Sequence, residues 1–271
     1  MPLLRLFAIA LFLHLSASVA LACGPEKNCP IGDRFYRIAM PEGHDGTTPV
    51  GALVWAHGYR GTATAVMRNG SLRRMVSDAG LALIAAQGVN GSWNLPYGPR
   101  TFDSTGAAEF AYFDSVLEDA EKRFPIDRNR IVASGFSAGG MMVWNLACSH
   151  PAKFAGFIPM SGTFWLKPPQ SCTGPISSIV HIHGDADRTV PLTGRAIGET
   201  KQGKVIDALA KYTEFGGFNP SKPSKPGGLT CQNRSNANGK ILEFCLFSGG
   251  HSFRTEYLRY GIKRLRAAGQ I

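Results

Sequence analysis

The segment GFSAG, residues 135–139, has the residue types of a serine nucleophile on a tight turn. It matches G-x-S-x-G, in which a strand turns sharply into a helix and presents the serine hydroxyl at the end of a sheet. Glycine is needed at the outer positions because a Cβ there would clash with neighbouring backbone. The apolar run RIVASG leads into the segment and the helical stretch AGGMMVWNLAC follows it. This context predicts Ser137 as a catalytic nucleophile.

A serine hydroxyl is a weak nucleophile and needs a histidine base that a carboxylate orients. In sheets with a G-x-S-x-G turn, the three groups follow the chain in the order serine, acid, histidine. The stretch VHIHGDADRTVP, residues 180–191, offers Asp185 and Asp187 as the acid, and His251 is the one histidine beyond both. The order therefore predicts His251 as the base and leaves the choice between the two aspartates open.

The same stretch has a second interpretation as a metal site. His181, His183 and Asp185 alternate along a strand, as the ligands of a metallohydrolase can. Such a site needs a further ligand, and Ala186 stands where the pattern H-x-H-x-D-H has a histidine. We therefore predict neither a metal nor another cofactor.

The segment WAHGYRG, residues 55–61, follows an early apolar run and can supply backbone donors for an oxyanion. An oxyanion hole needs N–H groups aimed at the position where negative charge develops. We expect the N–H of Tyr59 to act with the N–H of Ala138, the residue after the nucleophile. His57 precedes the serine, so we expect it to be a structural hydrogen-bonding residue and not the base.

These residues lie at the ends of apolar runs that alternate with helical stretches. Runs of four to eight apolar residues ending near glycine are typical of buried strands, whereas apolar residues three or four apart indicate helices. The expected strands are 51–58, 81–88, 130–135, 154–162, 177–184 and 240–247, and the expected helices are 107–124, 138–150 and 203–215. Alternating strands and helices predict an α/β fold, a mostly parallel central sheet with helices on both faces in a single domain.

The segments HGYRG, GFSAGG, HGDADRTVP and GGHSF occur in that order between about residues 35 and 255. In these motifs the chain resembles the secreted polyhydroxybutyrate depolymerase and feruloyl esterase group of α/β hydrolases. This resemblance implies the α/β-hydrolase fold and a serine esterase with Ser137 as nucleophile and His251 as base. It also selects Asp187 as the acid, with Asp185 as a turn residue. Depolymerases that attack crystalline polymer typically carry extra binding domains, for which no segment of this sequence is left over.

The resemblance implies an ester substrate but does not choose among hydroxyalkanoate oligomers, feruloyl esters, acetylated xylan and simple acyl esters. Trp93 and Trp165 lie in expected loops, where they can line an acyl pocket or pack within the protein. Trp144 lies inside an expected helix, and we expect it in the core. A third class of function is a binding protein that has kept the fold without the activity.

The chain of 271 residues has 44% hydrophobic residues and a formal net charge of +10. This length and composition suit one globular catalytic domain. Lysines and arginines are scattered and no nucleic-acid-binding motif accompanies them, so we expect no nucleic-acid partner. The oligomeric state does not follow from the sequence.

The N-terminal segment 1–22 has Arg5, an apolar run and the small-residue end Ala20-Leu21-Ala22, as cleaved export signals do. We expect residues 1–22 to be a signal peptide and 23–271 to be the catalytic domain, in a secreted or periplasmic protein. A transmembrane anchor is the alternative, but the uninterrupted apolar part is shorter than the roughly 20 residues needed to span a bilayer. We expect no stable membrane insertion, and lipid attachment at Cys23 remains an open alternative.

Export permits disulfides, and the cysteine count of six is even. Asn238-Gly239 predicts a two-residue hairpin turn that would set Cys231 opposite Cys245. A short N-terminal loop would pair Cys23 with Cys29, which leaves Cys148 and Cys172 as the third pair or as free buried thiols.

Overall fold

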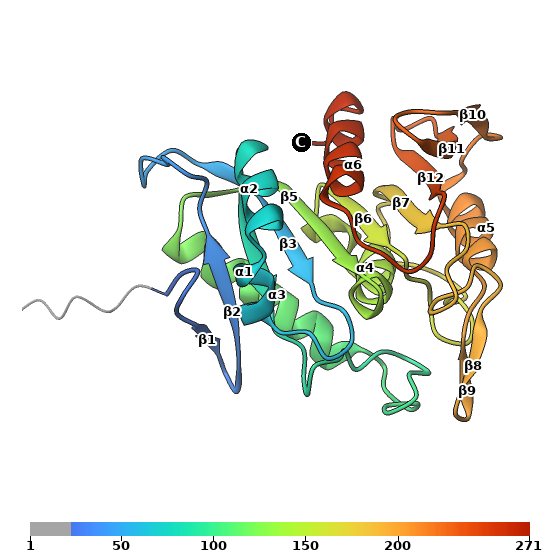
Figure 1. The fold of residues 1–271 in the computed structure, drawn as a ribbon, viewed down its shortest axis with the longest axis horizontal. Coiled ribbons are helices and arrows are strands. Elements are labelled where there is room, and N and C mark those ends of the chain that lie inside the picture. Colours follow the sequence, from blue (N-terminus) through green and yellow to red (C-terminus); the bar gives the residue numbers. More distant parts are fainter. Residues whose placement is uncertain (1–22) are drawn as a thin grey trace, which may run out of the picture.

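A sheet of ten strands in the order β1-β2-β4-β3-β5-β6-β7-β12-β11-β10 crosses the molecule in the computed structural model, which describes residues 23–271 (Figure 1). Its six central strands run parallel to one another. They are β4 (Leu81–Ala86), β3 (Val50–Ala56), β5 (Ile126–Phe136), β6 (Gly156–Met160), β7 (Ser178–Gly184) and β12 (Ile241–Phe247). Every residue of β4, β6 and β7 is buried, as expected for parallel strands covered on both faces.

Antiparallel strands extend this parallel centre at both ends. On one side lie β2 (Arg34–Ala39) and β1 (Cys29–Ile31), and on the other lie β11 (Leu229–Ser235) and β10 (Lys222–Ser224). A separate small hairpin consists of β8 (Arg195–Ile197) and β9 (Thr200–Gln202).

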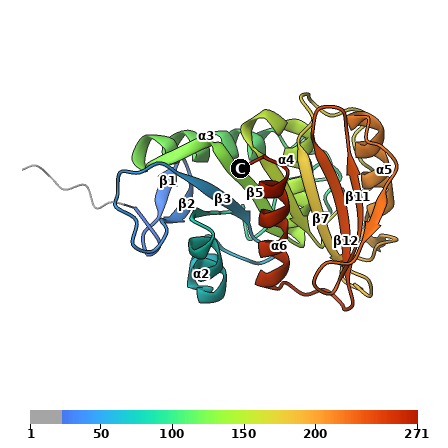
Figure 2. The ribbon, with the colours of Figure 1, turned by 90° about the horizontal axis from the view of Figure 1, so that it is seen from above.

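Helices cover both faces of the sheet, and each face has its own hydrophobic core (Figure 2). One core includes residues of α3 (Ala107–Arg123), α4 (Ala138–Ser149) and α5 (Val205–Gly216). The other includes residues of α1 (Ala63–Arg68), α2 (Gly70–Asp78) and α6 (Thr255–Ala267). A short 3-10 helix, Pro151–Lys153, follows α4. The predicted α/β fold with helices on both faces is therefore confirmed.

Each central strand and each of the three helices expected from the sequence is present, with ends shifted by a few residues. Two features differ from expectation. The turn between β11 and β12 is longer than two residues: Gly239 donates to Asn236 O at 3.1 Å, and Gly239 has a φ of +69° whereas Asn238 has no positive φ. Residues 216–230 are dense in glycine, proline and serine, which predicts an exposed loop, but they contain the short strand β10.

Three disulfides join Cys23 to Cys29, Cys148 to Cys172 and Cys231 to Cys245. The last pair lies directly opposite in the β11–β12 register, as the hairpin interpretation expects despite its different turn. The cysteines of this pair also lie near the Glu243 carboxylate, a cluster with metal-ligand spacing, but their sulfurs are bonded to each other.

The predicted export signal, residues 1–22, lies outside the described residues. Across residues 23–271, no helix combines the length and the apolar character that a membrane span requires.

Candidate active site

Ser137 lies on a strained turn between β5 and α4. Its φ of 61° and ψ of −121° place it outside the regions that non-glycine residues normally adopt, and such strain is typical of functional residues. The turn needs glycine on both sides: a Cβ on Gly139 would lie 1.9 Å from Ala56 O, and one on Gly135 would lie 2.6 Å from the same oxygen. The motif therefore has the strand, turn and helix geometry that the sequence predicted for it.

His251 and Asp187 form a hydrogen-bonded pair in loops that follow the neighbouring strands β12 and β7. His251 Nδ1 donates to Asp187 Oδ2 at 2.7 Å. The imidazole also packs on the ring of Phe136, the residue before Ser137, with the ring centroids 4.5 Å apart. The structure thus brings His251 to the end of β5 where Ser137 lies.

Asp187 is buried, and several donors hold its carboxylate. Oδ1 accepts hydrogen bonds from the Thr189 and Val190 N–H groups, each at 2.8 Å. Burial alone would raise the pKa of Asp187, but donors from His183, His251 and the Val190 backbone outweigh burial and hold the pKa below its usual range. Asp187 is therefore ionised at neutral pH and positioned to orient a histidine.

Asp185 has a different place. Its side chain is exposed and its Oδ1 accepts from the Gly249 N–H at 2.9 Å. The Ala186 N–H donates to Gly249 O at 2.9 Å as well. These bonds tie the loop that carries Asp187 to the loop that carries His251, so Asp185 accepts backbone N–H bonds as the turn interpretation expects.

The loop after β3 lies against the nucleophile turn. A Cβ on Gly58 would lie 3.6 Å from the Cβ of Ser137, so the two backbones approach closely there. Within the described part of the chain, the Tyr59 N–H has no hydrogen-bond acceptor. The N–H of Ala138 is the first of α4 and has no acceptor within that helix. Both predicted oxyanion donors therefore lie beside the turn with unused N–H groups.

His57 has the structural role that its position before Ser137 predicts. It is buried, its Nε2 accepts from the Gly88 N–H at 2.9 Å, and its Nδ1 donates to Gly58 O at 2.9 Å. Trp93 Nε1 donates to His57 O at 2.9 Å. Burial lowers the pKa of His57, so the ring stays neutral and fixes the Gly58 loop.

His181 and His183 form a buried hydrogen-bond chain that leads to Asp187. Trp144 Nε1 donates to His181 Nδ1 at 3.0 Å, and His181 Nε2 lies 3.0 Å from His183 Nδ1. An indole N–H can only donate, so His181 must carry its proton on Nε2 and donate to His183. The His183 proton is then on Nε2, which lies 2.8 Å from Val190 O and 3.4 Å from Asp187 Oδ2. All four ring nitrogens therefore have hydrogen-bond partners within the protein. The alternative interpretation of these residues as metal ligands did not predict this arrangement.

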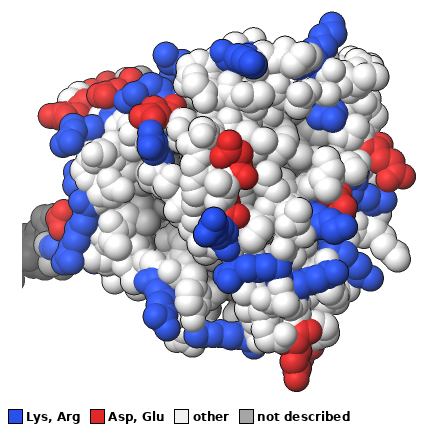
Figure 3. Space-filling model, turned by 45° about the vertical axis from the view of Figure 1, so that its right-hand side comes forward, with Lys and Arg blue, Asp and Glu red and all other residues white. Residues whose placement is uncertain are grey.

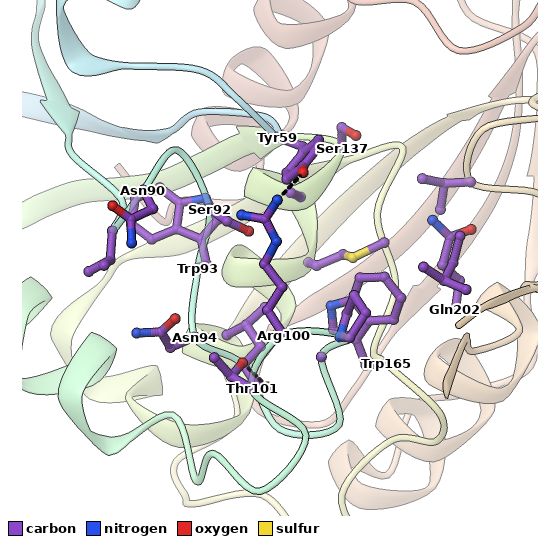
Figure 4. Close-up of a pocket in the computed structure, with 18 of the residues that line it drawn as sticks. Tyr59, Asn90, Ser92, Trp93, Asn94, Arg100, Thr101, Ser137, Trp165 and Gln202 are labelled. Atoms are coloured by element: carbon purple, nitrogen blue, oxygen red, sulfur yellow. Dashed lines mark hydrogen bonds between the residues drawn. The ribbon is translucent and has the colours of Figure 1, made fainter. Parts of the chain in front are cut away.

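A pocket of about 550 Å³ opens beside Ser137. Trp93 and Trp165, the two expected substrate-binding residues, both line it, although Trp93 is largely buried (Figure 4). Other lining residues carried no sequence signal, because they lie in irregular loops or in the short β8–β9 hairpin: Asn90, Asn94, Arg100, Arg195 and Gln202. Trp144, in contrast, is fully buried in the core, as expected.

Comparison with known proteins agrees with this fold. A family model described as Phospholipase/Carboxylesterase matches residues 107–225, which include Ser137 and Asp187. Feruloyl esterase C from Emericella nidulans is 25% identical over 91% of this chain and 88% of its own.

Solved structures show the same fold. The acetyl xylan esterase from Aspergillus awamori superposes with a TM-score of 0.64 at 13% identity, over 92% of this chain and 97% of its own. The carboxylesterase from Bacillus cereus superposes with a TM-score of 0.57 at 15% identity, over 88% of this chain and 95% of its own. The chain is therefore an esterase with the α/β-hydrolase fold, similar in sequence to feruloyl esterases.

Proposed function

We propose that Ser137, His251 and Asp187 act as a catalytic triad that hydrolyses carboxylic esters through an acyl-enzyme. The observation that carries this proposal is the 2.7 Å bond from His251 to Asp187, in loops of two neighbouring strands, together with the strained turn at Ser137. This combination of nucleophile, base and orienting carboxylate defines the triad on unrelated folds.

In the first half of the reaction, Ser137 Oγ attacks the ester carbonyl carbon and His251 Nε2 takes the hydroxyl proton. The bond from the carbonyl carbon to the alcohol oxygen then breaks, and the alcohol leaves with the proton from His251. In the second half, His251 takes a proton from water, the hydroxide attacks the acyl carbon, and Ser137 Oγ leaves with that proton. The products are one carboxylic acid and one alcohol.

Negative charge develops on the carbonyl oxygen in both halves. The N–H groups of Tyr59 and Ala138 are the proposed donors to that oxygen, because both lie beside Ser137 and have no partner within their own elements. Asp187 remains ionised because of its several donors, and its charge stabilises the imidazolium of His251.

The choice of ester is also a proposal. The relatives above are named for feruloyl and acetyl xylan esters, which favours feruloyl and acetyl esters of plant polysaccharide as substrates. Trp93 and Trp165 give the pocket flat apolar walls that suit an aromatic acyl group. Hydroxyalkanoate oligomers, as cleaved by the depolymerases that the motifs resemble, are the second candidate.

Export of the protein is a further part of the proposal. Three disulfides persist readily in the periplasm or outside the cell and are rare in the cytosol. Together with the signal-like segment 1–22, they support a cleaved leader and a catalytic domain of residues 23–271.

This function is tested by measuring ester hydrolysis by wild type and Ser137→Ala. The substrates are 4-nitrophenyl acetate, 4-nitrophenyl butyrate, methyl ferulate, acetylxylan and 3-hydroxybutyrate oligomers. Wild type should hydrolyse at least the nitrophenyl esters, and the variant should lose at least about 10³-fold in kcat. Hydrolysis at the wild-type rate by Ser137→Ala would overturn the proposal.

A further inference from the structure

The pocket beside Ser137 is unbalanced in charge. Two arginines, Arg100 and Arg195, line it, and the described residues that line it include no aspartate or glutamate. The rest of the wall is apolar or neutral, with Trp93, Trp165 and Met141 among its members. Lys and Arg are spread over the face in Figure 3 with Asp and Glu among them, so the absence of acids is a property of this pocket and not of the whole surface.

Arg100 is held at the pocket wall without a carboxylate partner. Its Nη2 donates to Tyr59 Oη at 2.5 Å, and its guanidinium carbon lies 5.2 Å from the centre of the Tyr59 ring. Figure 4 shows the side chain extending from its loop toward Tyr59, close to Ser137. Among residues 23–271, no carboxylate forms an ion pair with Arg100. Its remaining N–H donors are therefore available to a ligand.

Arg195 comes to the same pocket from a separate element, the first strand of the β8–β9 hairpin. Its Nε donates to Thr189 O at 2.8 Å, which ties the side chain to the loop that carries Asp187. The terminal nitrogens of Arg195 have no ion-pair partner in the described part of the chain either. Arg100 is thus anchored by one bond to a neutral group, and Arg195 Nε by two, to Thr189 O and to Gln202 Oε1 at 3.4 Å. Both guanidinium groups have donors left over.

We propose that the preferred substrates are esters that also carry a carboxylate, which Arg100 and Arg195 bind while the ester carbonyl lies at Ser137. This proposal rests on the esterase function proposed above for the same site, and it favours hydroxyacid oligomers, the second candidate there, over neutral feruloyl and acetyl esters. A guanidinium pairs with a carboxylate through parallel, charge-assisted hydrogen bonds, and the apolar walls strengthen that pairing.

Monoesters of dicarboxylic acids and short hydroxyacid oligomers with a free carboxyl end have the required chemistry. Cleavage of a monoester gives a dicarboxylic acid and an alcohol, and cleavage of an oligomer gives two shorter hydroxyacids. In both cases the substrate already carries one carboxylate, and hydrolysis creates a second. A neutral acetyl or feruloyl ester would leave both arginines without an anionic partner.

Two matched substrate pairs test the proposal, since the carboxylate can lie on either side of the scissile bond. The first pair is 4-nitrophenyl hydrogen adipate and its monoamide, 4-nitrophenyl adipamate. The second pair is 4-carboxyphenyl butyrate and 4-carbamoylphenyl butyrate. Within each pair the members have nearly the same shape, and the acid alone is charged. Non-enzymatic hydrolysis is subtracted from each rate.

In wild type, kcat/KM for the acid should exceed that for the amide by at least about tenfold in one pair, the effect of one charge-assisted hydrogen bond. The ratio should fall to within about threefold in Arg100→Gln and in Arg195→Gln, and it should also fall as salt screens the exposed guanidinium groups. Because the readout is a ratio within each protein, a general change in activity does not affect it. Arg128→Gln, an exposed arginine at the opposite end of β5, should keep the wild-type ratio.

Equal rates for acid and amide in both pairs in wild type would overturn the proposal, and so would a preference for the acid that persists in both arginine variants. Hydrolysis of neutral 4-nitrophenyl butyrate separates this outcome from failure of the esterase proposal. If that hydrolysis requires Ser137 and the acid preference is absent, the carboxylate proposal alone fails. If it does not require Ser137, the proposed mechanism itself fails.

Discussion

His183 Nε2 lies 3.4 Å from Asp187 Oδ2, and both side chains are completely buried. The proton on that nitrogen is fixed from a distance, because Trp144 can only donate to His181 and thereby sets the tautomer of both histidines. The Asp187 carboxylate, which is proposed to orient His251, is therefore held by a chain of hydrogen bonds that begins at Trp144 in the core helix α4. In this account His183 is a positioning residue for Asp187.

Replacing Trp144 by Phe should remove the hydrogen bond to His181 that starts this chain of hydrogen bonds, while it keeps most of the packing. Both histidines could then exchange tautomers, and His183 would no longer always present a proton toward Asp187. We expect kcat/KM to fall by about 5–30-fold with little change in KM. Steady-state kinetics on 4-nitrophenyl butyrate separates kcat from KM and measures this effect.

Tyr212→Phe is the matched control for that variant. Tyr212 packs on Trp144, and its hydroxyl accepts from the Ser177 N–H and donates to Ser177 O. Tyr212→Phe therefore removes two buried hydrogen bonds from the same core without changing the bonds of the histidines. An equal fall in kcat/KM in both variants, or no fall in Trp144→Phe, would contradict the positioning role.

The two aspartates of the HGDAD segment should differ sharply in effect. Asp187→Asn should reduce kcat by about 10³–10⁴-fold, since the amide cannot stabilise an imidazolium and favours the wrong tautomer of His251. Asp185→Asn should stay within about tenfold of wild type, because Asp185 only holds a loop through the Gly249 N–H. Steady-state kinetics on 4-nitrophenyl butyrate measures both. The reverse order of effects would mean that Asp185 is the acid.

Most of this site could be predicted from the sequence, because its residues lie at the ends of apolar runs and in recognisable turn motifs. Continuous apolar runs fix the parallel strands, and parallel strands bring their carboxyl ends to one edge, where Ser137, Asp187 and His251 meet. The β1–β2 pair and helices α1 and α2 were not foreseen, because these elements are short or mainly polar and their placement depends on tertiary contacts.

Long-range contacts explain what sequence reasoning could not reach. Trp144 and His181 are 37 residues apart, and no spacing rule links an indole in a helix to a histidine in a strand. The same histidines suggested a metal site because alternation along a strand is shared by ligand pairs and by buried residues on one face. Arg100 and Arg195 lie in loop or hairpin segments without periodicity, so no pattern marks them as pocket residues.

The close approach at the nucleophile turn predicts a strong effect of one methyl group. Gly139→Ala would place a Cβ 1.9 Å from Ala56 O, so α4 and β3 must move apart. We expect a loss of about 2–4 kcal/mol in the free energy of unfolding and a loss of activity greater than tenfold. Urea denaturation and ester hydrolysis measure the two effects.

Gly70→Ala is the control for that substitution. Its Cβ would meet only the flexible end of Arg74 at 3.5 Å, at the first residue of α2. Alanine there should leave stability within about 1 kcal/mol of wild type or raise it. Equal stability of both variants would show that the turn is not as tight as described.

Stability should fall as the pH falls below about 6.5. Burial lowers the pKa of His57 and of His181 below that ordinary value, so between the folded and unfolded pKa values the unfolded chain binds more protons. Each histidine then contributes a slope of up to about 1.4 kcal/mol per pH unit, and its stabilising effect is fully present only above pH 6.5. Urea denaturation from pH 5 to pH 8 measures this slope, which should be smaller in His57→Gln. A free energy of unfolding that stays constant or rises toward pH 5 would contradict the burial of two neutral histidines.

The most direct test of the account is to map the covalent adduct of a fluorophosphonate by intact-protein and peptide mass spectrometry. Wild type should gain the mass of one phosphonyl group on Ser137, with the rate of labelling reduced in His251→Ala and in Asp187→Asn. Ser137→Ala should gain no adduct. Labelling at another residue, or no labelling of a protein that hydrolyses esters, would contradict the claim that Ser137 is the nucleophile.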